Sequence, residues 1–167
     1  MKKATLFFFF PLFFYSCKKD SPAPVSYTKV SVTKLTILAS PATNNSGGDW
    51  DNALAGYYPD VYFKITNTGT TTALYSLPVA NRQENMKQSD LPVSWAASSG
   101  APFFVLSNLS QVVDVDLYDY ESIGSDEYMG SATFNFSSYT SGSNSYPPSI
   151  TVTTNRMSIK LDLIWLQ

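Results

Sequence analysis

The segment Val113-Asp-Val-Asp-Leu-Tyr118, which is followed by Asp119, decides the fold of this chain. Its apolar residues Val113, Val115 and Leu117 alternate with Asp and Tyr, and a period of two predicts a strand with one buried and one wet face. The segment that follows, Tyr-Glu-Ser-Ile-Gly-Ser-Asp-Glu127, is polar and acidic. The pattern therefore predicts a half-buried strand that ends in an acidic loop.

The same alternation recurs along the chain from Lys29 to Gln167, a length that fits one domain. Further strands are predicted at 30–39, 60–66, 73–78, 93–98, 103–106, 128–136, 150–154 and 157–165. Clusters of Asn, Gly and Ser lie between them and favour chain reversals. Only the interval from Gln83 to Leu91 suggests a helical turn, and it is equally compatible with a polar loop. We therefore expect an all-β fold, an antiparallel β-sandwich of seven to nine strands.

The amino terminus predicts export. Lys2 and Lys3 precede a short apolar run, so residues 1–16 are typical of a signal peptide rather than a permanent membrane span. The segment Phe14-Tyr-Ser-Cys17 resembles a bacterial lipobox, although Leu is usual at Phe14 and a small residue at Tyr15. The resemblance implies an acylated Cys17, a tether over residues 17–28 and a lipid-anchored protein of the bacterial envelope, in the outer membrane. The alternative is a free thiol beside a signal peptide that is cut elsewhere.

Composition excludes several classes of function. Removal of Lys2 and Lys3 with the signal peptide changes the formal net charge from −2 to −4, and no basic stripe is present, so nucleic acid is not an expected partner. The chain has no His and its single Cys is assigned to the anchor, which excludes zinc sites and His-dependent nucleophiles. A hydrolase that uses a pair of acids remains open, but we expect no enzyme.

The acidic residues gather in two segments. Seven of the 13 acids are Asp119, Glu121, Asp126 and Glu127 in one segment, and Asp49, Asp51 and Asp60 in the other. Two carboxylates about 4 Å apart repel by roughly 4 kcal/mol at an effective dielectric near 20. If folding brings these segments together, a hard cation with oxygen ligands is needed, and calcium is the first candidate cofactor.

The acids and their neighbours resemble a known family. Leu117-Tyr-Asp-Tyr-Glu-Ser-Ile-Gly-Ser-Asp-Glu-Tyr-Met-Gly130 is similar to a strand junction of C2 domains, which are calcium-dependent lipid-binding sandwiches, and Asp60-Val-Tyr-Phe-Lys64 is similar to their Asp-Pro-Tyr-Val segment. The resemblance implies the calcium ligands Asp51, Asp60, Asp119, Glu121 and Glu127, with Asp49 and Asp126 as weaker candidates. The chain departs from the family in Val61, in Glu at 121 and 127, and in a longer first loop, which leaves the number of ions open.

Aromatic residues lie beside the first acidic segment. If Trp50, Tyr57 and Tyr58 are exposed, they are candidates to contact a glycan or protein partner; otherwise they cover the edge of a core. We therefore expect a calcium-binding, C2-like recognition domain on a lipid anchor. The alternative is a metal-free sandwich for adhesion or assembly, in which the acids only shape turns.

Overall fold

A computed structural model describes residues 25–51, 56–98 and 101–167. The predicted signal peptide, Cys17 and the tether as far as residue 24 lie outside the described residues. The strands in the described part are β1 (Lys29–Ala39), β2 (Val61–Asn67), β3 (Ala73–Ser76), β4 (Val93–Ala96), β5 (Phe104–Leu106), β6 (Val112–Asp119), β7 (Glu127–Asn135), β8 (Ser149–Thr153) and β9 (Ser158–Leu166). Three short 3-10 helices are η1 (Val79–Asn81), η2 (Gln88–Asp90) and η3 (Ser137–Tyr139). Within these ranges no helix has the length and apolar character that a membrane crossing requires.

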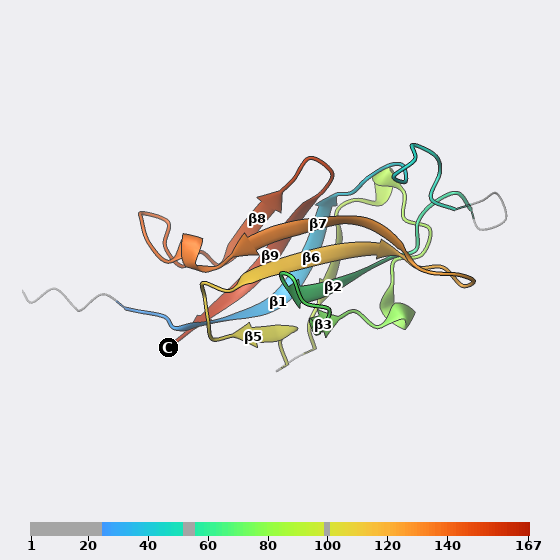
Figure 1. The fold of residues 1–167 in the computed structure, drawn as a ribbon. Coiled ribbons are helices and arrows are strands. Elements are labelled where there is room, and N and C mark those ends of the chain that lie inside the picture. The colour runs from blue at the N-terminus through green and yellow to red at the C-terminus, as the bar shows by residue number, and fades with distance from the viewer. Residues whose placement is uncertain (1–24, 52–55, 99–100) are drawn as a thin grey trace, which may run out of the picture.

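The strands form two antiparallel sheets packed face to face (Figure 1). One sheet has the order β4-β1-β9-β8. Strand β5 also belongs to this sheet and pairs with the first part of β1, whereas β4 pairs with a later part of β1. The other sheet has the order β3-β2-β6-β7. The expected all-β antiparallel sandwich of seven to nine strands is confirmed. Strand β6 spans the residues whose alternation predicted it.

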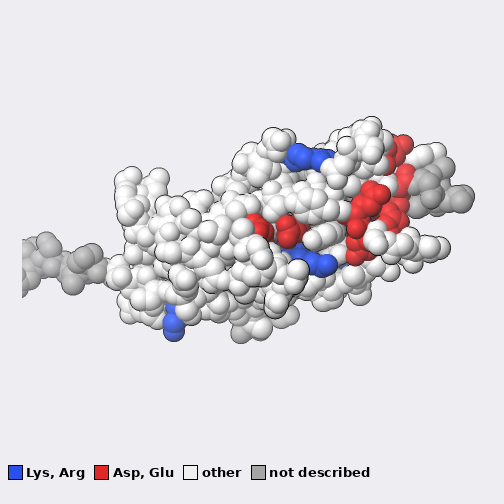
Figure 2. Space-filling model, viewed as in Figure 1, with Lys and Arg blue, Asp and Glu red and all other residues white. Residues whose placement is uncertain are grey.

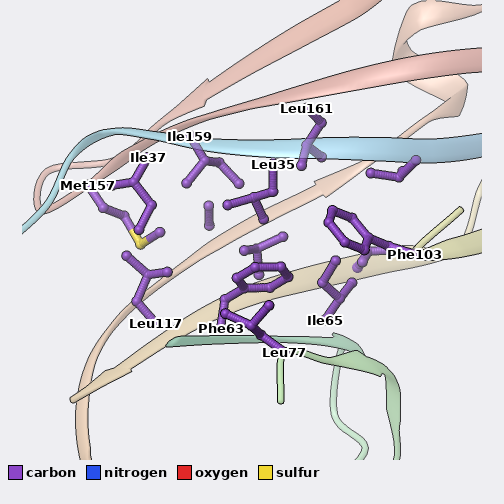
Figure 3. Packing of buried hydrophobic residues seen from close by; sticks show 14 of the residues in the cluster. Leu35, Ile37, Phe63, Ile65, Leu77, Phe103, Leu117, Met157, Ile159 and Leu161 are labelled. Atoms are coloured by element: carbon purple, nitrogen blue, oxygen red, sulfur yellow. The ribbon is translucent and has the colours of Figure 1, made fainter. Parts of the chain in front are cut away.

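The core lies between the two sheets and is built from the inward-facing residues of their central strands. Leu35 of β1 and Leu161 of β9 pair with each other and are fully buried, as are Phe63 of β2 and Leu117 of β6 in the opposite sheet. Figure 3 shows these side chains pointing toward one another across the space between the sheets. Apolar burial of this kind supplies the main favourable term in folding.

One local prediction differs from the structure, and the structure decides one alternative that the sequence left open. The bulge expected at Lys34-Leu35 lies one residue earlier, between Val32 and Lys34, and a second irregularity lies between Ile37 and Ala39. The interval from Gln83 to Leu91 is mostly loop, with one 3-10 turn at its end. A bulge changes which face a side chain points to, and sequence alternation locates that change only to within a residue.

The described chain begins at the end of the sandwich opposite the acidic loops (Figure 1). The Thr28 N–H donates to the Leu166 carbonyl over 2.9 Å, and the Tyr27 ring packs edge-on against Tyr146 with centroids 4.8 Å apart. The segment that leads to the predicted anchor is therefore attached to the sandwich from Tyr27 onward. The loops before β2 and after β6 project from the far end.

Replacement of Phe63 by Ala tests the assignment of the core. Its ring is fully buried, so the substitution is predicted to lower the free energy of unfolding by about 3–5 kcal/mol in urea denaturation. Ile164→Ala is the control, because that side chain is 53% exposed and its loss is expected to change stability by less than about 0.5 kcal/mol. Equal losses in the two variants would contradict the arrangement described.

Candidate metal centre

The end of β6 places a carboxylate inside the sandwich. Asp119 pairs with Val61 in the antiparallel register of β6 and β2, and the inward-facing residues of β6 fall on Val113, Val115, Leu117 and then Asp119. The alternation that places apolar side chains of β6 in the core thus also places the Asp119 side chain on the inward face. Asp119 is fully buried, whereas the other polar residues of the strand face outward.

The Asp119 carboxylate is only partly satisfied by the protein. Its Oδ1 accepts a hydrogen bond from the Asp60 N–H over 2.6 Å. Its Oδ2 is buried and has no hydrogen-bond partner among the described residues. A buried carboxylate oxygen without a partner is costly, because the charged form loses its hydration without compensation.

Asp119 has two acidic neighbours from different loops. One carboxylate oxygen each from Asp51, Asp119 and Glu121 lie within 4.8 Å of one another. Asp51 comes from the loop between β1 and β2, and Glu121 follows the end of β6. The two acidic segments of the sequence therefore meet at one end of the sandwich, where Figure 2 shows acidic side chains gathered.

A hydrogen-bonded brace fixes the position of Glu121. Asp126 Oδ2 accepts a hydrogen bond from the Tyr62 hydroxyl over 2.6 Å, and Asp126 Oδ1 accepts one from the Glu121 N–H over 3.2 Å. Asp126 thus ties the loop after β6 to the outward side chain of Tyr62 on β2. These two hydrogen bonds, both between protein groups, hold the loop that carries Glu121.

The crowding of acids changes their protonation. Burial, and after it the negative charges of Asp51, Glu121 and Asp60, raise the pKa of Asp119 to about 7. Burial and neighbouring acids also raise the pKa of Asp51 and of Glu121. In each case the first cause is desolvation, and the like charges add to it. The negative charges of Asp51, Asp119 and Glu121 are therefore not balanced by nearby positive charge among the described residues.

Asp60 lies beside this cluster but has other partners. Its Oδ2 accepts from Arg82 Nε over 3.0 Å, and its Oδ1 accepts the Asn85 N–H over 2.9 Å. Arg82 also forms an ion pair with Glu84 and lies over the Tyr120 ring. The Arg82 guanidinium thus forms an ion pair with the Asp60 carboxylate, and both Asp60 carboxylate oxygens accept hydrogen bonds.

The remaining predicted ligands lie around the cluster and outside its three-residue centre. Glu127 opens β7 opposite Asp119, is exposed, and its charge acts on Asp51 and Glu121. Asp126 has the bracing role described above. Asp49 is exposed, and its backbone carbonyl accepts a hydrogen bond from the Asn44 amide.

The three aromatic residues of the first loop have different environments. Trp50 is 5% exposed and donates its indole N–H to the Pro41 carbonyl, so the structure places it in the core and corrects its assignment as a ligand-contacting residue. Tyr57 and Tyr58 are exposed, as that assignment requires. Tyr57 and Tyr58 lie in the chain between Asp51 and Asp60, and both of these acids line a cavity of about 420 Å³. The other lining residues are Arg82, Asn85, Tyr120, Glu121, Ser122 and Ile123.

Sequence reasoning missed the residues that support the site. Arg82, Asn85 and Tyr62 each bind an acid of the two segments through contacts that span many residues of sequence. No spacing rule links Arg82 to Asp60. The one available signal was the scarcity of basic residues, which makes an Arg in a polar loop a candidate partner for an acid.

Comparisons with known proteins give matches of fold only. No protein-family model matches the chain, and no curated protein matches it. Among solved structures, the chain is similar to C2 domain A of plant extended synaptotagmin 1, with 13% identity and a TM-score of 0.44 over 86% of this chain and 97% of that one. It is similar to human GIVD cytosolic phospholipase A2 in complex with methyl gamma-linolenyl fluorophosphonate, with 12% identity and a TM-score of 0.44, and covers only 18% of that protein. The C2 domain A of RIM from Drosophila matches with 11% identity and a TM-score of 0.33, over 86% of this chain and 100% of that domain. At these values the similarities carry no conclusion about the site.

The raised pKa of Asp119 predicts the pH dependence of stability. Because its folded-state pKa of about 7 lies above the ordinary 3.8, the folded protein holds this proton more tightly than the unfolded chain does. In the presence of a chelator, the stability contributed by the protonated Asp119 is therefore lost as pH rises through about 7. Thermal denaturation at pH 5, 6, 7 and 8 measures the effect.

Asp119→Asn is the matched control for this prediction. The amide keeps the shape of the side chain and cannot ionise, so the variant is expected to lose less stability than the native protein between pH 5 and 8. It is also expected to be the more stable of the two at pH 8 without a cation. Identical pH profiles of the two proteins would contradict the assignment.

Proposed function

We propose that this chain is a calcium-binding, C2-like recognition domain displayed on a lipid anchor at the bacterial envelope, in the outer membrane. The observation that carries the proposal is the buried Asp119 carboxylate, whose Oδ2 lacks a partner among the described residues, beside Asp51 and Glu121. A bound cation would satisfy that oxygen and remove the repulsion among the three acids.

The chemistry of the donor set favours calcium. All candidate ligands are oxygens, and calcium takes six to eight of them at about 2.3–2.6 Å. Two ligands on opposite sides of such an ion lie about 5 Å apart, so the spread of 4.8 Å among Asp51, Asp119 and Glu121 is compatible with one ion between them. Backbone carbonyls, water or a ligand would complete the coordination.

The Asp60–Arg82 pair limits the charge that a cation has to balance. Because Arg82 pairs with Asp60, the acids that have no ion pair among the described residues include the three of the cluster. A divalent ion would balance two of these three negative charges. Because the ion would ligate the Asp119 carboxylate, its binding is expected to displace the proton that Asp119 holds near neutral pH.

The position of the site supports recognition of a partner rather than attachment to the anchoring membrane. The described chain begins at the opposite end of the sandwich, where Tyr27 packs on Tyr146. The chain that leads from a lipidated Cys17 would thus join the sandwich at the end opposite the acidic loops. The exposed Tyr57, Tyr58 and Ile123 would then contact a glycan or protein partner.

One observation favours the alternative, a metal-free adhesion or assembly module. Asp60 and Asp126 have complete roles within the loops, through Arg82 and through Tyr62, without a cation. If Asp119 simply remains protonated, the loops are ordered without metal. The response to calcium distinguishes the two functions.

Addition of calcium to the purified protein is predicted to raise its Tm. A ligand that binds only the folded state at 100 times its Kd adds about 2.7 kcal/mol to the free energy of unfolding. Thermal denaturation at pH 7.5 with a calcium series, and with magnesium at equal concentrations, measures this. An unchanged Tm at millimolar calcium would leave the metal-free module as the function.

Two variants show whether the effect comes from the cluster. Asp119→Asn is expected to abolish the calcium-dependent rise while the protein remains folded, because it removes the central ligand charge. Asp162→Asn removes an acid that is paired with Lys160 in the other sheet, and is expected to keep the full rise. A rise that survives Asp119→Asn would place calcium elsewhere.

Replacement of Cys17 by Ala tests the anchor. Acyl chains contribute about 0.8 kcal/mol per buried methylene, so their loss is expected to move the protein from the membrane fraction of cells to the soluble fraction. Fractionation followed by immunoblotting measures the distribution, with Ser21→Ala as the control in the tether. A Cys17→Ala protein that stays with the membranes would disprove lipidation as the means of attachment.

A further inference from the structure

A second opening lies at an edge of the sandwich, and its lining shares no residue with that of the cavity at the acidic loops. Strand β3 ends one sheet and β4 ends the other, and both border a cavity of about 460 Å³. The cavity extends to Phe103, just before β5, where the loop after β4 separates β4 from β5. Its volume falls within the range of small-molecule pockets, about 300–1,000 Å³.

The walls of this edge groove are aromatic. Tyr75 of β3 and Trp95 of β4 pair with the inward-facing residues Ile65 and Leu35, so both point between the sheets. The centroid of the Tyr75 ring lies 4.6 Å from that of Phe103, and the centroid of the Trp95 ring lies 5.5 Å from that of the buried Phe63. Figure 3 shows Phe63, Phe103 and Leu77 in the core from which this wall extends.

The Trp95 indole is held in a fixed orientation. Its N–H donates to the Asn81 carbonyl of η1 over 2.8 Å, which ties β4 to the connection after β3. The Trp95 side chain lines the groove and is only partly buried. A fixed, partly exposed indole is a surface on which a flat apolar face can stack at low entropic cost.

Hydroxyl groups accompany the rings. The hydroxyl-bearing residues Tyr75 and Ser98 line the groove. Burial raises the pKa of Tyr75, so its hydroxyl stays protonated at neutral pH. The lining contains no Asp, Glu, Lys or Arg among the described residues, in contrast to the cavity at the acidic loops.

Stacking rings, neutral hydroxyls and the absence of charge in the described lining fit one class of ligand. Pyranose rings carry apolar faces of C–H groups and a rim of hydroxyls that donate and accept hydrogen bonds. We propose that the edge groove binds a neutral saccharide, with Trp95 and Tyr75 against a pyranose ring and the Tyr75 and Ser98 hydroxyls bonded to its hydroxyl groups. This site is independent of calcium, because none of its residues belongs to the acidic cluster.

Calorimetric titration with neutral hexasaccharides tests the proposal. The probes are cellohexaose, maltohexaose, mannohexaose and xylohexaose, and the protein is the full-length chain in a sugar-free detergent. At least one probe is expected to bind saturably, with equal affinity in calcium and in EDTA. No binding by any of the four would overturn the proposal, and binding lost in EDTA would assign the saccharide to the acidic loops.

Conservative variants locate the binding. Tyr75→Phe keeps the ring and removes one hydroxyl, and is expected to weaken binding about tenfold. Ser98→Ala is expected to weaken it by a smaller factor. Tyr27→Phe removes a hydroxyl where the chain joins the sandwich, remote from the groove lining, and is expected to change nothing. Unaltered affinity in both groove variants, or equal weakening by Tyr27→Phe, would contradict the assignment.

Discussion

The burial of the Asp119 carboxylate is the constraint on which the functional end of the molecule depends. The register of β6 against β2 fixes Asp119 as an inward residue, and the Asp60 N–H is its one hydrogen-bond donor among the described residues. The other acids at this end of the sandwich lie around Asp119. Asp51 and Glu121 approach it, while Asp60 forms an ion pair with Arg82.

Protonation and cation binding are two ways to satisfy the same carboxylate. A pKa of about 7 means that Asp119 binds a proton near neutral pH when no cation is present. The brace from Tyr62 through Asp126 to Glu121 uses only protein groups. On this account a cation would exchange with the Asp119 proton at a site whose loop is already held by hydrogen bonds.

The sequence was most informative where periodicity links a residue to a face. Alternation along Val113 to Leu117 predicted β6 and located Asp119 at its end, and the structure has both. It was uninformative in the long first loop, where Trp50 folds back to Pro41 and joins the core. Arg82 and Asp60 likewise meet only through the tertiary fold. Neither a loop nor a long-range ion pair has a period from which side-chain direction follows.

The most direct measurement of the central claim is the number of protons released when calcium binds. Calorimetry at pH 7 in buffers of different ionisation enthalpy gives this number. With the Asp119 pKa at about 7, we predict the release of about half a proton per calcium bound, falling toward zero at pH 8.5. Calcium binding without proton release at pH 7, or no heat of binding at all, would contradict the placement of the ion at Asp119.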